Sequence, residues 1–342
     1  MMNYSALLTR LIERQDLPHD HMLELMQQVM GGQLTPAQIA AILVALRIKG
    51  ETVTEIAAAA EVMRDLSTKV NVKNTAHLID TCGTGGDGAQ TFNISTASAL
   101  VAAAAGAQVA KHGGRSVSST CGSADVLEKL GVNVNLTPDQ VAQCVDSIGI
   151  GFMFAPNHHS AMKYAAPVRR ELGVRTLFNL LGPLTNPAGA KNQVMGVFHR
   201  DLTAMLARVL QQLGSRHVLV VHGADGMDEI SISGPTYIAE LKDGKVSEYT
   251  VQPQKFGIKT APLDAIRVAN ADEAKAMLLA VLDNHPGAAR DIVQLNAGAA
   301  IYVAGLVETL KEGVAKAGLV ISSGAAKAKL EELVALSNKL QA

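Results

Sequence analysis

After about residue 75 the sequence alternates short apolar runs with amphipathic stretches, and this alternation restricts the possible folds more than any other feature. The runs HLID, AQVAKH, GIGFMFAP, QVMGVF and HVLVVHG are predicted to be buried strands. The stretches between them, STASALVAAAAG, SADVLEKLG, TPDQVAQCVDSIG and DLTAMLARVLQQLG, are predicted helices. Such alternation predicts an α/β fold with a mostly parallel central sheet. TYIAELKDGKVSEYTV predicts a hairpin that turns at Asp243-Gly244.

The amino-terminal part has a different pattern, because it contains helix signals only. Thr35, Pro36 and Gln38 form a capping box with proline in the first turn, and Gly50 ends that predicted helix. TVTEIAAAAEVMRDLS predicts a second helix. We therefore expect a small helical domain over residues 1–72 and a large α/β domain over residues 73–342.

The amino-acid composition indicates which kinds of molecule the protein is not expected to bind. Lys and Arg number 30 against 31 Asp and Glu, so the net charge of −1 argues against a general nucleic-acid or membrane binder. Cys82, Cys121 and Cys144 cannot all pair with one another, which favours a reduced, cytoplasmic chain. The first residues, MMNYSALLTRLIERQ, have no unbroken apolar core, so we do not expect a signal peptide.

The stretch DTCGTGGDGAQTFNIST contains Gly83-x-Gly85-x-x-Gly88, the spacing of a dinucleotide-binding loop. Two features argue against a dinucleotide. Residues 89–95 separate the loop from its helix, and Lys111, His112 and Arg115 stand where an acidic ribose ligand is expected. Taken alone, the glycines are also compatible with a tight turn that binds nothing.

A phosphate-type ligand fits the neighbouring residues better. Asn93, Ser95 and Thr96 begin an alanine-rich helix, whose free N–H groups favour an anion, although Ser95 could simply cap the helix. KHGGRSVSS, residues 111–119, forms a second glycine- and serine-rich loop after the next predicted strand. Two such loops at successive strand ends predict one anion pocket at the carboxyl edge of the sheet. The sequence has no Walker motif.

Acidic residues follow the strand HVLVVHG. Asp225, Asp228 and Glu229 could face solvent, but opposite two phosphate-type loops they favour Mg²⁺, which takes carboxylates and ligand oxygens. His158 and His159 are expected at a helix start rather than in a zinc site. No catalytic nucleophile or strong general base is apparent. The pattern suits transfer at a carbon that carries a phosphate-type leaving group.

The motifs GTGGDG, NISTAS, KHGGRSVSSTCGSAD, PVRRELGVRTLFNLLGPLTNP and HGADGMDE, in this order, resemble the anthranilate phosphoribosyltransferases over essentially the whole chain. The resemblance implies the nucleoside phosphorylase/phosphoribosyltransferase type of fold, with a helical insertion near residues 165–190. It also implies a homodimer formed through the helical domain. The implied reaction joins anthranilate to phosphoribosyl diphosphate (PRPP), giving N-(5-phosphoribosyl)anthranilate and diphosphate in tryptophan biosynthesis.

The resemblance also implies site residues. Two Mg²⁺ ions per subunit would be held by Ser95, Asp228 and Glu229, and Arg169 would bind the anthranilate carboxylate. The positions implied for substrate binding are, besides Arg169, Gly83, Gly86, Asp87, Thr91, Asn93, Ile94, Ser95, Thr96, Lys111, His112, Gly113, Gly114, Arg115, Ser116, Val117, Ser118, Ser119 and Ser123.

Two positions depart from the family pattern. Gly114 stands where the family often has an Asn that touches anthranilate, and Thr120 replaces a frequent Lys. Two rival functions share the fold. One is a pyrimidine-nucleoside phosphorylase, against which PVRRELG and the acidic pair argue, and the other is a non-catalytic relative that binds nucleic acid.

Overall fold

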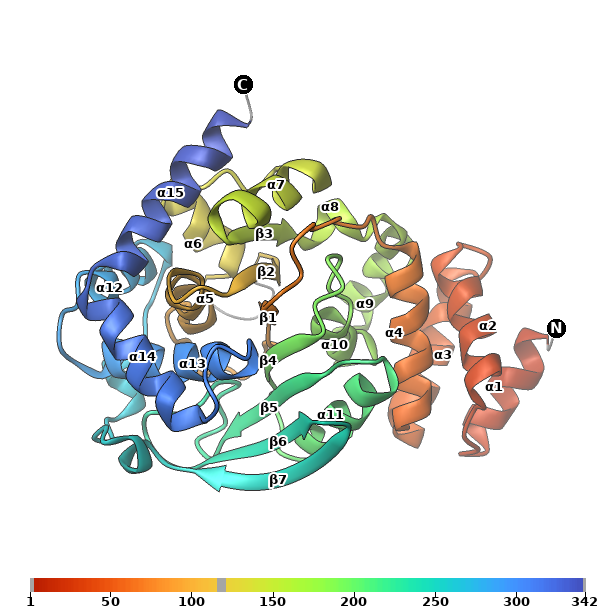
Figure 1. The fold of residues 1–342 in the computed structure, drawn as a ribbon. Coiled ribbons are helices and arrows are strands. Elements are labelled where there is room, and N and C mark those ends of the chain that lie inside the picture. Colours follow the sequence, from red (N-terminus) through yellow and green to blue (C-terminus); the bar gives the residue numbers. More distant parts are fainter. Residues whose placement is uncertain (1–2, 116–120, 341–342) are drawn as a thin grey trace.

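The computed structural model describes residues 3–115 and 121–340, and within them one sheet has seven strands. The strands are β1 (Leu78–Thr81), β2 (Gln108–Gly113), β3 (Ile150–Phe154), β4 (Asn192–Gly196), β5 (His217–Gly223), β6 (Thr236–Lys242) and β7 (Lys245–Val251). Their order across the sheet is β3-β2-β1-β4-β5-β6-β7 (Figure 1). Of the site predictions, Ser116, Val117, Ser118 and Ser119 lie outside the described residues, as does Thr120.

The centre of the sheet is parallel. β1 lies between β2 and β4, with Ile79 opposite Val109 and Thr81 opposite Val194. The carboxyl ends of these three strands therefore share one edge. The predicted hairpin β6–β7 is antiparallel and turns at Asp243 and Gly244, which have φ of 51° and 71°.

Four helices form the amino-terminal part: α1 (Tyr4–Ile12), α2 (His19–Met30), α3 (Pro36–Lys49) and α4 (Val53–Leu66). The predicted capping box is present, because Thr35 accepts the N–H of Gln38 while the Gln38 side chain accepts the N–H of Thr35. Leu7, Leu25 and Ile42 are fully buried in one core between these helices. Figure 1 shows the four helices grouped beside the sheet at the end where the chain begins.

The remaining helices pack against the sheet, against one another or against the amino-terminal helices. They are α5 (Ile94–Ala104), α6 (Ser123–Lys129), α7 (Pro138–Ile148), α8 (Ala155–His158), α9 (Ala166–Leu172), α10 (Phe178–Leu181), α11 (Leu202–Gln212), α12 (Ala271–Leu282), α13 (Ala288–Val303), α14 (Leu310–Ser322) and α15 (Ala325–Lys339), with 3₁₀ turns η1 (Ser160–Tyr164), η2 (Gly182–Leu184), η3 (Pro253–Phe256) and η4 (Leu263–Ile266). α13 packs against α5 and α14, and α11 packs against α4, β5 and β6. The predicted fold class, a small helical part plus an α/β domain with a mostly parallel sheet, is confirmed.

Residues near the predicted insertion pack with the amino-terminal helices. Val168, Leu177 and Phe178 are buried in the same core as Leu25 and Ile42. The assignment of residues 165–190 to the small domain stays a prediction, as does the boundary at residue 72.

The prediction that the two histidines stand at a helix start is confirmed for His159, which is the N-cap residue of η1. It was wrong for His158, which is the last residue of α8, because Ala155 and Pro156 begin that helix.

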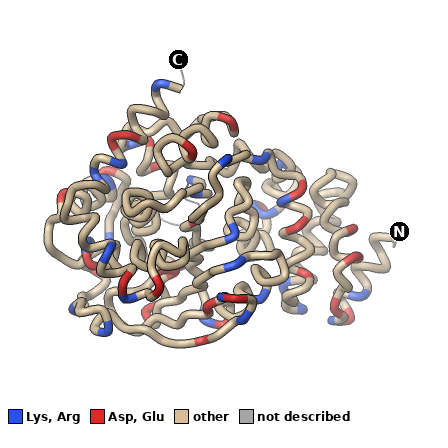
Figure 2. The backbone as a smooth tube through the Cα atoms, in the orientation of Figure 1, with Lys and Arg blue, Asp and Glu red and all other residues tan. Residues whose placement is uncertain are grey.

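Acidic and basic residues are interspersed over the described backbone (Figure 2). Cys82, Cys121 and Cys144 are free thiols. None of the helices described here combines the length and the apolar character needed to cross a membrane.

Candidate active site

The first glycine loop leaves the carboxyl end of β1 and has a left-handed backbone. Gly85, Gly86 and Gly88 have φ of 64°, 76° and 72°, values that residues with a Cβ rarely adopt. Thr84 ties the start of the loop to β4 by donating its N–H to the Gly196 carbonyl at 2.9 Å. The glycines are thus required by the conformation of the loop.

The segment that follows the loop is fixed by a partner far away in sequence. Thr91 forms an isolated antiparallel bridge with Arg267, and Phe92 donates its N–H to the Ile266 carbonyl at 3.1 Å. Ile94, the first residue of α5, is buried. This pairing sets the direction in which α5 begins.

The start of α5 carries polar groups without protein partners. Asn93 donates its side-chain amide to the Cys121 carbonyl at 3.0 Å and makes no side-chain cap. Among the described residues, the buried Asn93 Oδ1 and Thr96 Oγ1 have no hydrogen-bond partner. Buried polar atoms of this kind are costly unless something binds them.

The side chain of Lys111, from β2, also reaches the start of α5. Its buried Nζ donates to the Thr81 carbonyl at 2.5 Å and to Ser95 Oγ at 3.2 Å. Glu229, beyond the end of β5, accepts the backbone N–H of Ser95. The structure therefore brings a residue from each predicted segment together at the start of α5, as the sequence predicted.

The acidic groups are close to one another and to the glycine loop. Asp228 Oδ2 accepts the Gly85 N–H at 2.8 Å, and the Asp228 N–H points to Asp87 Oδ2 at 3.4 Å. Burial, and then the charge of Asp87, raise the pKa of Asp228 to about 7. Burial and the charge of Asp228 also raise the pKa of Glu229, while Lys111 opposes that rise. The group has more negative charge than Lys111 alone can balance.

Two glycines allow the acidic segment to approach so closely. A Cβ on Gly83 would lie 2.8 Å from Asp228 Oδ2. A Cβ on Gly196 would lie 1.5 Å from the Asp228 backbone oxygen, which no side chain could avoid. Glycine at 196, which the sequence analysis did not single out, therefore sets how near Asp228 can come to the sheet.

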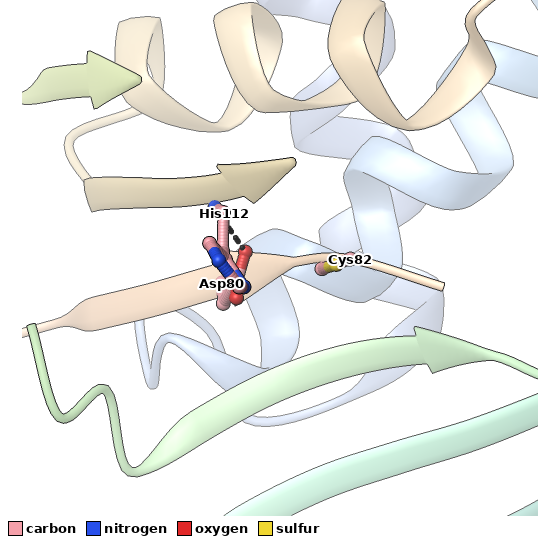
Figure 3. Close-up of side chains that lie close together, drawn as sticks. All are labelled: Asp80, Cys82 and His112. Carbon is pink, nitrogen blue, oxygen red and sulfur yellow. Dashed lines mark hydrogen bonds between the residues drawn. The ribbon is translucent and has the colours of Figure 1, made fainter. Parts of the chain in front are cut away.

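The second loop begins at the end of β2. Asp80 of β1 is fully buried and accepts the His112 N–H at 3.1 Å and the Asn186 amide at 2.7 Å. Figure 3 shows Asp80 and His112 side by side on neighbouring strands. A Cβ on Gly113 would lie 3.2 Å from the Ser123 Cβ, so Ser123, which is also a predicted substrate-binding residue, lies next to the start of this loop.

Asp80, Cys82 and His112 could in principle hold a metal, because their ligand atoms lie within 4.8 Å of one another. Both Asp80 oxygens, however, already accept protein hydrogen bonds. Burial and the Asp80 charge raise the pKa of the Cys82 thiol far above its usual value, whereas metals bind the thiolate. These three side chains thus fit a structural role better than a metal site.

Arg115 and Gly114 extend beyond the buried part of the site. The Arg115 guanidinium is paired with Asp125 at 2.8 Å and Glu128 at 2.7 Å, both from α6, rather than with the glycine loop. Gly114 accepts the Ala124 N–H through its carbonyl at 3.1 Å, and no atom of residues 3–115 and 121–340 lies within 4 Å of where its Cβ would be. These residues therefore leave open space at this position.

Arg169 lies on α9, near the helical part of the molecule. It is half-buried, and its Cζ is 5.3 Å from the centroid of the Phe178 ring. Burial lowers its pKa. Within the described residues its guanidinium has no hydrogen-bond partner, so its donors are available to a ligand, whereas the adjacent Arg170 is exposed.

The sequence grouped Asp225 with Asp228 and Glu229, but in the structure its carboxylate contacts residues of its own loop instead. Asp225 accepts hydrogen bonds from the Ser231 and Ser233 hydroxyls and from the Met227 N–H, so it shapes the loop that carries Asp228. Sequence reasoning did not identify Asp80 or Asn186 as parts of the site. The only signal for Asp80 was an acidic residue inside an apolar strand.

A buried group of histidines was also missed. The rings of His112 and His159 lie 5.1 Å apart, and burial lowers the pKa of these residues to about 3 and about 4. Both rings are therefore neutral at pH 7. In the part of the chain that the structure describes, the Nε2 atoms of His112, His158 and His159 have no hydrogen-bond partner.

Comparison with known proteins agrees with this geometry. Residues 5–67 match the helical bundle domain of a glycosyl transferase family, and residues 75–327 match the a/b domain of that family. The chain is 60% identical to the anthranilate phosphoribosyltransferase of Nitrosomonas europaea over 100% of both chains, and 64% identical to that of Thiobacillus denitrificans over 99% of both.

Solved structures are similar as well. The anthranilate phosphoribosyltransferase of Thermus thermophilus superimposes with a TM-score of 0.93 at 43% identity, over 98% of this chain and 100% of the other. The enzyme from Saccharomyces cerevisiae in complex with PRPP and Mg gives 0.83 at 27% identity, over 94% and 92%. The chain therefore belongs to the anthranilate phosphoribosyltransferase family of glycosyl transferases.

Proposed function

We propose that the chain transfers the phosphoribosyl group of PRPP to the amine of anthranilate, releasing diphosphate, as a step of tryptophan biosynthesis. The observation that carries the proposal is the convergence of the glycine loop, the start of α5, Lys111 and the acidic pair at one sheet edge. Gly85 N–H to Asp228 and Lys111 to Ser95, at 2.8 and 3.2 Å, join these parts directly.

PRPP, the donor of the phosphoribosyl group, would lie along the glycine loop and the start of α5. The N–H groups of Ile94 and Thr96 donate within the chain and that of Ser95 donates to Glu229, so the free N–H groups expected from the sequence are not present at the first three residues of α5. The unpartnered Thr96 Oγ1 can donate to a phosphate oxygen, and the unpartnered Asn93 Oδ1 can accept from a ribose hydroxyl. Lys111 adds a positive charge beside Ser95. The residues proposed to bind PRPP are those named for the resemblance, of which residues 116–119 lie outside the described part of the chain.

Two Mg²⁺ ions would bind together with PRPP, and Ser95, Asp228 and Glu229 would hold them. The donor set fits magnesium, because it offers oxygen ligands only and its carboxylates have raised pKa values that a cation would lower. When bound, Mg²⁺ neutralises the charge of the departing diphosphate.

Arg169 orients the acceptor. A guanidinium binds a planar carboxylate through two parallel hydrogen bonds, and the donors of Arg169 are available for this. The amine of anthranilate is uncharged at neutral pH, so its lone pair can form the new bond to the ribose C1 while the C1–O bond to diphosphate breaks. The nitrogen then loses one proton to solvent or to the departing diphosphate, so the step does not need a strong base.

We further place the active chain in a cytoplasmic homodimer that associates through the helical domain. Ile48 of α3 is 65% exposed and Val174 is 57% exposed, and both line a hollow between α3 and residues 174–176. We take these exposed apolar side chains as part of the surface that a second copy would cover. The three free thiols suit a reducing compartment.

One assay tests the reaction. Anthranilate fluorescence should fall when PRPP is added with Mg²⁺ and should stay constant when EDTA replaces Mg²⁺. Phosphorolysis of thymidine or uridine in place of this reaction would favour the nucleoside phosphorylase function instead.

A further inference from the structure

We infer that Arg175 is a positioning residue that holds one peptide of the glycine loop in the orientation needed for PRPP; the inference rests on the proposed function. Arg175 lies between α9 and α10 and is exposed. Its guanidinium donates a hydrogen bond to the Gly86 carbonyl, and its Cζ lies 4.1 Å from the centroid of the Phe198 ring. No sequence motif had pointed to this contact.

The contact fixes an N–H group as well as a carbonyl. The Gly86 carbonyl and the Asp87 N–H belong to one planar trans peptide, so they point in opposite directions. While Arg175 holds the carbonyl, the Asp87 N–H must point away from Arg175. Among the described residues this N–H has no hydrogen-bond partner. It is therefore a donor that remains available to an anion bound along the loop.

Without an anchor this peptide would be free to turn. Gly86 has φ of 76° and no Cβ to oppose rotation. A reversed peptide would present the Gly86 carbonyl oxygen to the phosphate in place of the Asp87 N–H, and two negative groups would then face each other. The described contacts of the neighbours, Thr84 N–H to Gly196 and Ala89 N–H to Asp87 Oδ1 at 3.1 Å, hold other peptides.

The anchor is itself supported on one side. The Phe198 N–H donates to Thr84 Oγ1 at 3.2 Å, so the backbone of the residue whose ring lies under the guanidinium is tied to the same loop. On the other side, Arg175 borders the hollow that Val44 and Ile48 of α3 also line.

The test compares Arg175→Ala, Arg175→Lys and a matched control, Arg200→Ala. Arg200 also lies over an aromatic ring, with its Cζ 3.8 Å from the Tyr237 centroid, but it does not contact the loop. Titration calorimetry with Mg²⁺ and PRPP measures affinity directly. Arg175→Ala should weaken PRPP binding about tenfold, while the KM for anthranilate at saturating PRPP changes less than about twofold.

Arg175→Lys, which keeps a donor for the carbonyl, should recover part of the PRPP affinity, and Arg200→Ala should bind as the unaltered chain does. An affinity for PRPP that Arg175→Ala leaves unchanged, or a loss that Lys does not reduce, would overturn the inference.

A crystal structure of ligand-free Arg175→Ala tests the geometry separately from the reaction. A reversed or doubly oriented Gly86–Asp87 peptide supports the inference, and an unchanged peptide contradicts it. Failure of the unaltered chain to bind PRPP would instead count against the proposed function, so the two failures can be told apart.

Discussion

The molecule contains two buried groupings of lysine and carboxylates, and they are built differently. In the helical part, Lys49 and Glu55 lie 2.9 Å apart with side chains 2% and 0% exposed. Both Glu55 oxygens are satisfied, since one accepts the Leu17 N–H at 2.9 Å and the other accepts Lys49 and the Thr52 N–H. Every charge in this grouping has a protein partner.

At the sheet edge, the charges of Lys111, Asp228 and Glu229 are not paired with one another by hydrogen bonds, and we call these three residues the open group. Lys111 donates to Thr81 and Ser95 rather than to a carboxylate, and Asp228 and Glu229 have raised pKa values. The Lys49–Glu55 pair, which we call the closed pair, contributes to the stability of the fold. The charges of the open group, in contrast, are fully compensated only when a ligand and its cations bind. The two groupings should therefore respond in opposite ways to neutralisation.

The largest effect is expected at the open group. Asp228→Asn with Glu229→Gln should reduce Mg²⁺-dependent turnover at least about a thousandfold, because the carboxylates that bind the metal are lost. Steady-state assays over a range of Mg²⁺ concentrations would measure this. Unchanged turnover would remove both residues from the metal site.

The same double variant should be the more stable protein at pH 8 without metal. The folded-state pKa of Asp228, about 7, exceeds the value of about 3.9 expected when unfolded, so its stabilising contribution is lost as pH rises through 7. The Asn and Gln side chains of the variant do not ionise, so the variant does not lose this stability as the pH rises. The variant's lead in Tm should shrink between pH 7 and pH 4, and a lower Tm at pH 8 would contradict this account.

The closed pair should affect stability and not catalysis. Glu55→Gln leaves the buried Lys49 without its full counter-charge, so the free energy of unfolding should fall by about 3 kcal/mol in urea titrations. Asp16→Asn is the matched control, because Asp16 contacts the same lysine but is 67% exposed, and its loss should be below about 1 kcal/mol. A changed KM for either substrate in Glu55→Gln would blur the distinction between the groupings.

Arg169 tests whether the acceptor site is separate from the open group. Arg169→Ala should raise the KM for anthranilate by roughly ten- to a hundredfold, because a charge-assisted double hydrogen bond is lost. The KM for PRPP should change little, and the exposed neighbour in Arg170→Ala should leave both constants unchanged. Equal increases for both substrates would place Arg169 elsewhere.

The smallest effect is a gain. Gly114→Asn should lower the KM for anthranilate about fivefold, because one neutral hydrogen bond is added where the structure has open space. Gly114→Ala, which adds no hydrogen-bonding group, is the control. A higher KM in the Asn variant would show that the space serves another purpose.

Much of this arrangement could be predicted because its signals are local. The capping box at Thr35, the hairpin at Asp243-Gly244 and the strand–loop order all depend on residues close together in sequence. Parallel strands then place the loops after β1 and β2 at one edge, which explains why Ser95 and Lys111 were correctly expected to be neighbours.

What could not be predicted depends on contacts between distant segments. Asn186 meets Asp80 across 106 positions, and Arg175 meets Gly86 across 89. The bridge between Thr91 and Arg267 is longer still. Such pairs have no periodicity, because each follows from how packed layers align. The roles of the individual site residues stay predictions until the variants above are measured.

The near contact between Gly196 and the Asp228 backbone has an evolutionary consequence. Because even one methyl group at 196 would collide with the main chain of the acidic segment, any replacement must displace the proposed metal ligands. Every missense change in that codon should therefore be eliminated by selection wherever tryptophan must be made. Position 196 should therefore tolerate substitution as poorly as the proposed ligands do, although it has no chemistry of its own.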